Sequence, residues 1–130
     1  MPKLLVVEDD AMLRDLVSRR LQYMGYQVIT AVNGAAAIIA ARTERPDLIL
    51  MDMALPLING FQATERLKAQ PETASIPIIA LTAFATTSDR ARCLRAGCDE
   101  YESKPIAFVR LFSKIEAFVG QPGGDQRMLG

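Results

Sequence analysis

Short apolar runs alternate with longer amphipathic stretches along the chain, and five such pairs follow one another. Alternating strands and helices of this kind predict an α/β fold built on one parallel sheet. Several of the short runs (LLVV, LILM and IPIIAL) are continuously apolar, which is typical of inner strands covered by helices on both faces. The predicted strands are 3–8, 27–31, 47–52, 76–82 and 99–103.

The helices are predicted from apolar residues spaced three and four apart and from capping and stop residues. The first helix should start at a cap provided by Asp9 or Asp10 and stop at Gly25. The apolar stripe that we expect it to bury consists of Leu13, Leu16, Val17, Leu21 and Met24. The other helices are predicted at 33–45, 60–69, 87–96 and 107–119.

Two of these helices have further features. The last helix should face the core with the side formed by Phe108, Leu111, Phe112, Ile115 and Phe118. The second helix is apolar almost all round over 35–41, whereas a surface helix normally keeps a polar face. An additional contact surface on the second helix is therefore an open alternative.

The chain has 130 residues, half of them hydrophobic, which suits one domain with one core. After Val119 the residues GQPGGDQRMLG lose the helical periodicity and gain glycine and proline. We therefore predict one domain over 1–119 and a disordered tail over 120–130.

Composition narrows the classes of function. Fifteen basic residues balance fifteen acidic ones, so no net field favours nucleic acid or an anionic membrane. No apolar run approaches the roughly 20 residues that cross a bilayer, and we expect a cytoplasmic protein. Cys93 and Cys98 are predicted to be reduced core thiols. The chain has no histidine, which excludes Ser-His-Asp and Cys-His catalysis, histidine-ligated zinc and a role as phosphohistidine donor.

Polar side chains collect where the predicted strands end. The acidic run 8–10 follows the first strand, Asp52 and Thr82 end the third and fourth, and Lys104 follows the fifth. In doubly wound sheets, sites lie at the carboxyl ends of the strands. Carboxylates sharing such a crevice repel one another unless a hard cation such as Mg²⁺ joins them. A capping or ion-pairing role would explain any one of these residues, but four coincident strand ends favour a site that handles phosphate.

The motifs VVEDD, LILMDMALP with Gly60, ALTA and YESKP occur in this order over roughly residues 3–119. In order and spacing they resemble the single-domain response-regulator receivers of two-component systems, the CheY-like and DivK-like superfamily. The resemblance implies a flavodoxin-like doubly wound (βα)5 fold with a five-stranded parallel sheet of order 2-1-3-4-5. It also implies a phosphorylation switch that promotes its own phosphorylation and dephosphorylation, rather than a conventional enzyme.

The resemblance also implies a cation site. Glu8 and Asp9 would form its acidic pair, with Asp52 and the backbone carbonyl of Ala54 as further ligands of Mg²⁺ or Mn²⁺. Asp10 lies one position beyond the pair and is interpreted as a helix cap. Asp52 would then accept a phosphoryl group in a metal-dependent reaction.

The remaining motif residues would form the switch. The resemblance implies that Lys104 contacts the phosphate, that Thr82 is the switch hydroxyl and that Tyr101 is the rotating aromatic. The donor would be a sensor histidine kinase or a histidine phosphotransfer protein. A downstream protein would read the surface of the fourth helix, fifth strand and fifth helix, without direct contact to nucleic acid or membrane. A homodimer is left open.

Three positions depart from the common receiver pattern. Ala54 lacks a polar side chain and Phe84 is bulky and apolar; because both flank the route of hydrolytic water, we expect a longer-lived phosphate than in fast chemotaxis receivers. Asn59 stands where aspartate is common, and we expect it to be neutral because turns accept either residue. The Lys104–Pro105 bond is a cis candidate, as the family implies.

Three other functions share parts of this pattern. A flavodoxin-like electron carrier would have its flavin phosphate repelled by the acidic run 8–10. A haloacid-dehalogenase-type phosphatase would need an aspartate as general acid where this chain has Ala54. A metal-independent pseudo-receiver that only binds proteins is the main alternative, and the complete set of acidic, hydroxyl and lysine residues argues against it.

Overall fold

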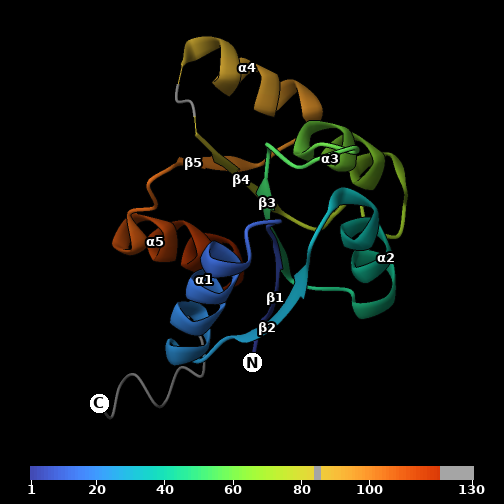
Figure 1. The fold of residues 1–130 in the computed structure, drawn as a ribbon. Helices are drawn as coiled ribbons and strands as arrows, with labels where there is room; N and C mark the ends of the chain where they lie inside the picture. Colours follow the sequence, from blue (N-terminus) through green and yellow to red (C-terminus); the bar gives the residue numbers. More distant parts are fainter. Residues whose placement is uncertain (84–85, 121–130) are drawn as a thin grey trace.

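One parallel sheet with helices on both faces makes up the computed structural model, which describes residues 1–83 and 86–120 (Figure 1). Its strands run in the order β2-β1-β3-β4-β5, which confirms the predicted flavodoxin-like order. The strands are β1 (Lys3–Val7), β2 (Gln27–Ala31), β3 (Leu48–Asp52), β4 (Ile78–Thr82) and β5 (Glu100–Ser103). The helices are α1 (Ala11–Tyr23), α2 (Gly34–Glu44), α3 (Gly60–Ala69), α4 (Thr87–Ala96) and α5 (Phe108–Val119).

The sheet separates two apolar layers. Strands β3 and β4 are buried along their whole length, and alternate residues of each strand face opposite layers. On one face, Leu4 and Val6 of β1 pack with α1 and α5, and on the other, Leu5 and Val7 pack with α2, α3 and α4. Burial on both faces explains why the inner strands are continuously apolar.

Helix ends follow the predicted signals. Asp10, and not Asp9, caps α1, because its Oδ1 accepts hydrogen bonds from the backbone of Met12 at 2.9 Å and Leu13 at 3.2 Å. Gly25 and Gly97 follow α1 and α4 with φ of 102° and 107°, left-handed values that favour glycine. The α5 helix starts one residue later than predicted, because Ala107 is its cap.

Two side chains predicted to be buried are exposed. Leu16 is 46% exposed because α1 buries a narrower stripe, with Val17 and Leu21 at its centre. Phe118 is 41% exposed because it lies in the last turn of α5. There it lines a surface hollow together with Met1. Helix α2 leaves Ile39 63% exposed. Whether α2 forms an additional contact surface stays an open prediction.

Cys93 and Cys98 are free and buried, as predicted. Burial raises the pKa of the Cys98 thiol to about 12, so it carries little of the reactive thiolate form. No helix within 1–83 and 86–120 has the length and hydropathy needed to cross a membrane. The predicted tail lies, from residue 121 on, outside the part of the chain that the structure describes.

The start of α3 is pressed against the end of β3. Asn59 caps α3 in a capping box, in which its side chain accepts from the Gln62 backbone at 2.9 Å and the Gln62 side chain accepts from the Asn59 backbone at 3.0 Å. The polar cap is consistent with the expected neutrality of Asn59. Gly60 follows, and a Cβ added there would lie 2.3 Å from the Asp52 carbonyl oxygen. Only glycine allows this approach, which fixes the loop 53–59 behind Asp52.

The substitution Gly60→Ala tests this close approach through the sign of its effect. Helix propensity alone would make alanine stabilising, by up to about 1 kcal/mol. The contact with the backbone of Asp52 predicts instead that the free energy of unfolding falls by about 1–3 kcal/mol, because the start of α3 must shift. Urea unfolding followed by circular dichroism measures the difference. An unchanged or higher urea midpoint in Gly60→Ala would show that a Cβ fits between the start of α3 and the Asp52 backbone.

Candidate functional site

Three acidic side chains meet at the carboxyl ends of β1 and β3. Glu8 and Asp9 follow β1, Asp52 ends β3, and carboxylate oxygens of all three lie within 4.8 Å of one another. Glu8 and Asp52 are only 2% and 3% exposed, whereas Asp9 is exposed. The two strands are hydrogen-bonded neighbours, so the sheet itself brings the carboxylates together as the sequence predicted.

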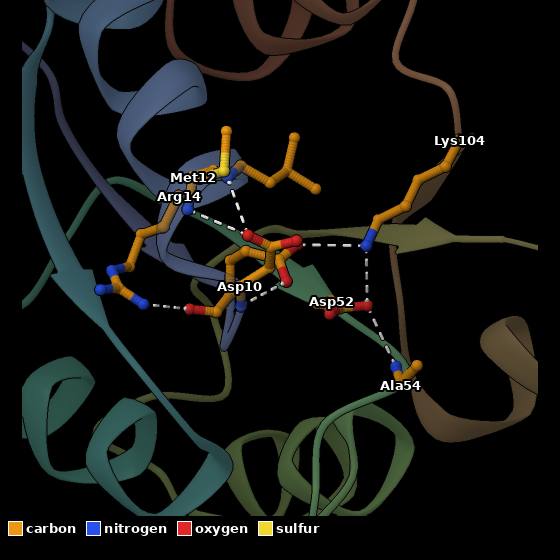
Figure 2. Close-up of polar contacts among 8 residues, drawn as sticks. Asp10, Met12, Arg14, Asp52, Ala54 and Lys104 are labelled. Carbon is orange, nitrogen blue, oxygen red and sulfur yellow. Dashed lines mark hydrogen bonds and ion pairs between the residues drawn. The ribbon is translucent and has the colours of Figure 1, made fainter.

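The Lys104 ammonium group lies between the two buried carboxylates. Its Nζ donates to Glu8 Oε1 at 3.1 Å and lies 3.3 Å from Asp52 Oδ1, and Figure 2 shows the side chain reaching from the end of β5 toward Asp52. The Lys104 backbone is fixed by its N–H, which donates to the Thr82 carbonyl at 2.7 Å. The Lys104–Pro105 bond is cis, as the resemblance implied.

Burial and like charge shape the electrostatics of this cluster. Burial raises the pKa of the Glu8 carboxyl from its ordinary 4.5 to about 7, and nearby Asp52 adds to the rise, against hydrogen bonds from the Asp10 backbone and Lys104. Burial lowers the pKa of Lys104, but its hydrogen bond to Glu8 and the charge of Asp52 outweigh this and leave the pKa raised. Three carboxyl groups thus share one lysine, and the crowding of like charge among them is unfavourable.

A turn at the start of α1 holds Glu8 in place. Glu8 Oε2 accepts from the Asp10 backbone N–H at 3.1 Å, and the Arg14 guanidinium donates to the Glu8 carbonyl at 2.9 Å (Figure 2). Sequence reasoning missed Arg14, and no spacing rule marks it, because the contact runs from a helix side chain to the backbone of the preceding loop.

The other predicted site residues are Ala54 and Thr82, at the carboxyl ends of β3 and β4, and Tyr101 on β5. The Ala54 backbone N–H donates to Asp52 Oδ1 at 3.1 Å. Thr82 ends β4 and is 6% exposed, and together with Ala54 it borders a cavity of about 300 Å³. Tyr101 is half-buried on β5 opposite Ala80 of β4. It therefore lies along the sheet from the site rather than in it.

The ligands in this cluster are all oxygen atoms. Carboxylate oxygens suit hard divalent cations such as Mg²⁺ and are poor ligands for soft metals. Glu8, Asp9 and Asp52 could together hold such an ion, and the crowding of like charge gives a physical reason for it to bind. Phe84, whose bulk is expected to affect hydrolysis, lies outside the described residues.

Comparison with known proteins decides the family. The family model described as the response regulator receiver domain matches residues 4–116. The chain belongs to the response regulator receiver family. One relative of this receiver is the polar-differentiation response regulator DivK of Brucella anthropi, which is 41% identical over 121 residues, covering 92% of this chain and 98% of that protein. DivK of Brucella ovis is 39% identical over 116 residues, covering 89% of this chain and 94% of that protein.

Solved receiver structures share its fold. The receiver domain of the sensor histidine kinase PA1611 from Pseudomonas aeruginosa PAO1 has a magnesium ion coordinated in its active-site cleft. It superposes with a TM-score of 0.85 at 36% identity, covering 92% of this chain and 98% of that one. The chemotaxis protein CheY4 of Vibrio cholerae superposes with a TM-score of 0.86 at 29% identity, covering 91% of this chain and 98% of that one. This receiver therefore has relatives that act in two-component signalling.

The raised pKa of Glu8 predicts a pH-dependent stability in the metal-free receiver. Between pH 4.5 and about 7 the folded state keeps a proton on Glu8 that the unfolded state has released, so this group's contribution to the free energy of unfolding falls as the pH rises through that window. Glu8→Gln removes the titration. In EDTA, the stability of Glu8→Gln relative to wild type should therefore rise from pH 4.5 to pH 7, measured by urea unfolding. A difference that stays constant would contradict the pKa assigned to Glu8.

Proposed function

We propose that this receiver is a phosphorylation switch in which Asp52 accepts a phosphoryl group from a phosphohistidine donor. The observation that carries the proposal is the position of Asp52, buried at the end of β3 beside two carboxylates and 3.3 Å from the Lys104 ammonium. A carboxylate oxygen would attack phosphorus as the bond to the donor imidazole nitrogen breaks, and the imidazole would leave with a proton.

The cation is part of the proposal. Glu8, Asp9 and Asp52 would hold Mg²⁺ or Mn²⁺ with the backbone carbonyl of Ala54, and the bound ion would supply positive charge to carboxylate and phosphoryl oxygens. The oxygen-only set of side chains and the magnesium ion of the PA1611 receiver support this assignment.

Chain residues would orient and neutralise the phosphoryl group. The Lys104 ammonium already lies between Glu8 and Asp52, so a short movement would pair it with a phosphoryl oxygen in a charge-assisted hydrogen bond. The Thr82 hydroxyl would donate to a second oxygen, and the Ala54 backbone N–H, which donates to Asp52 Oδ1, to a third. The switch would promote its own phosphorylation and hydrolysis through these contacts, with no additional catalytic residue.

The proposed readout follows from the order of the sheet. Thr82 and Tyr101 belong to the paired strands β4 and β5, and Tyr101 would move when phosphate draws Thr82 toward Asp52. We propose that a downstream protein reads the α4-β5-α5 surface. Its β5 and α5 parts are joined by buried Glu102, which contacts Arg110 at 3.0 Å and Lys114 at 2.9 Å.

The proposed setting is cytoplasmic, with a sensor histidine kinase or histidine phosphotransfer protein as donor. We assign 1–119 to the receiver domain, which includes the matched residues 4–116, and 120–130 to a tail. A second copy of the chain is an alternative partner on the readout surface. Contacts with nucleic acid or membrane are not part of the proposal. The competing function is a pseudo-receiver that binds proteins without phosphorylation.

Phosphorylation by a small donor separates the switch from the pseudo-receiver. With Mg²⁺ and acetyl phosphate, wild type should gain one phosphoryl group, measured by intact-protein mass spectrometry, and EDTA should abolish the gain. Asp52→Asn should remain unmodified because it lacks the nucleophile. Asp15→Asn, on an exposed part of α1, should be modified like wild type. Undiminished labelling of Asp52→Asn would exclude Asp52 as the acceptor.

Thermal melts test the cation site without any phosphodonor. Mg²⁺ at a hundredfold excess over its Kd should stabilise wild type by about 2.7 kcal/mol, because it binds the folded state. Asp9→Asn should melt at a higher temperature than wild type in EDTA, since one like charge is removed, and should lose most of the Mg²⁺ increment.

Asp10→Ala is the matched control for the melts, because Asp10 caps α1 one position along the chain. It should lose about 1 kcal/mol with EDTA and with Mg²⁺ alike, and should keep the Mg²⁺ increment. If Asp9→Asn were destabilised and both it and wild type were indifferent to Mg²⁺, the acidic cluster would have a structural role only.

A further inference from the structure

Helix α4 is attached to the body of the receiver by few buried side chains. Of its ten residues only Cys93 and Ala96 are buried, whereas α3, also ten residues long, buries five. Leu94 is 64% exposed, and Figure 1 shows α4 at one end of the molecule, beyond β4 and β5. An element with so little apolar burial belongs to the less stable part of a fold.

Two arginines of α4 lie over aromatic rings of neighbouring elements. The Arg90 guanidinium carbon is 4.9 Å from the ring centroid of Tyr101 on β5, and that of Arg92 is 3.9 Å from the ring centroid of Phe61 on α3. Within 1–83 and 86–120, neither guanidinium forms a salt bridge. Cation–π contacts therefore join α4 to the elements on both sides of it.

The backbone of Tyr101 is fixed independently of α4. Its N–H donates to Glu100 Oε1 at 2.9 Å, its carbonyl accepts from Lys114 Nζ, and it is paired with Ala80 of β4. A movement of Tyr101 must therefore come mainly from rotation of its side chain.

Lys114 also lies near the ring, with its Nζ 5.2 Å from the Tyr101 centroid. That ammonium is held by the buried Glu102 carboxylate at 2.9 Å, and both belong to the β5–α5 unit that carries Tyr101. The Arg90 contact is different because it links the ring to α4.

We propose that Arg90 is a positioning residue whose guanidinium holds the Tyr101 ring next to α4 and so opposes the movement of the ring on phosphorylation. We call this contact the latch. The inference rests on the proposed function, in which the ring moves on phosphorylation. Rotation of the ring, or a shift of α4, breaks the contact and leaves the guanidinium of Arg90, an exposed residue, without its aromatic partner. Arg90 thereby favours the unphosphorylated arrangement. Removal of the latch should raise the affinity for a phosphate mimic about two- to fivefold, the factor expected for an exposed cation–π contact.

The test combines binding with a spectroscopic signal from the ring. Wild type, Arg90→Gln, Arg90→Lys and Arg95→Gln are labelled with 3-fluorotyrosine, and the Tyr101 resonance is assigned by its loss in Tyr101→Phe. Each protein is then titrated with beryllofluoride in the presence of Mg²⁺. Arg95 is the matched control, because it is an exposed arginine of the same helix without an aromatic or carboxylate contact in the described part of the chain.

In Arg90→Gln without beryllofluoride, we expect the Tyr101 resonance to move toward its beryllofluoride-bound position and the binding midpoint to fall two- to fivefold. Arg90→Lys should lie between wild type and Arg90→Gln, since it keeps a cation, and Arg95→Gln should match wild type. An Arg90→Gln protein that matches Arg95→Gln in both readouts would overturn the latch but leave the switch intact. A wild type whose Tyr101 resonance does not respond to beryllofluoride would overturn the proposed movement of Tyr101, and the latch with it, whereas phosphorylation of Asp52 is tested separately by mass spectrometry.

Discussion

The carboxylates of Glu8 and Asp52 are almost fully buried, and the ammonium group of Lys104 contacts both. Like charges at this separation repel strongly in a poorly solvated site, so the surrounding structure must hold them together. The Arg14 contact with the Glu8 carbonyl and the closely packed Gly60 do so from two sides. The receiver thus keeps crowded carboxyl groups ready for a cation, and its stability depends on these supports.

The same lysine connects the site to the edge of the sheet. Its ammonium contacts Asp52, while its backbone N–H donates to the carbonyl of Thr82 at 2.7 Å. Tyr101 lies three residues before it on β5, a short edge strand hydrogen-bonded to β4 on its inner side. Contacts therefore run from Asp52 through Lys104 and Thr82 to β5, whose Tyr101 lies beneath α4.

The sheet and the site could be predicted from the sequence because both depend on short-range patterns. Apolar runs determine which strands are inner, and polar residues at strand ends converge once the strands are parallel. The prediction that Leu16 and Phe118 are buried was wrong, because their burial depends on how far neighbouring elements extend over each helix. The contacts of Arg14 and Arg90 were not foreseen. The partners of long, flexible side chains depend on which groups lie nearby in the folded structure, and residue spacing along the chain does not predict them.

The approach of Gly60 to Asp52 also limits how this protein can vary in evolution. The loop 53–59 leaves the sheet after Asp52, and Gly60 at its far end packs against the Asp52 carbonyl and donates its N–H to the Met53 carbonyl at 3.2 Å, so the two ends of the loop are held close together. Exposed loop residues can be replaced without moving the ends of the loop, although Leu57, which is 96% exposed, has a left-handed φ of 63° that disfavours β-branched replacements. An inserted or deleted residue cannot be absorbed locally, since it would shift α3 against Asp52. Divergence in this loop should therefore proceed by replacement at constant length.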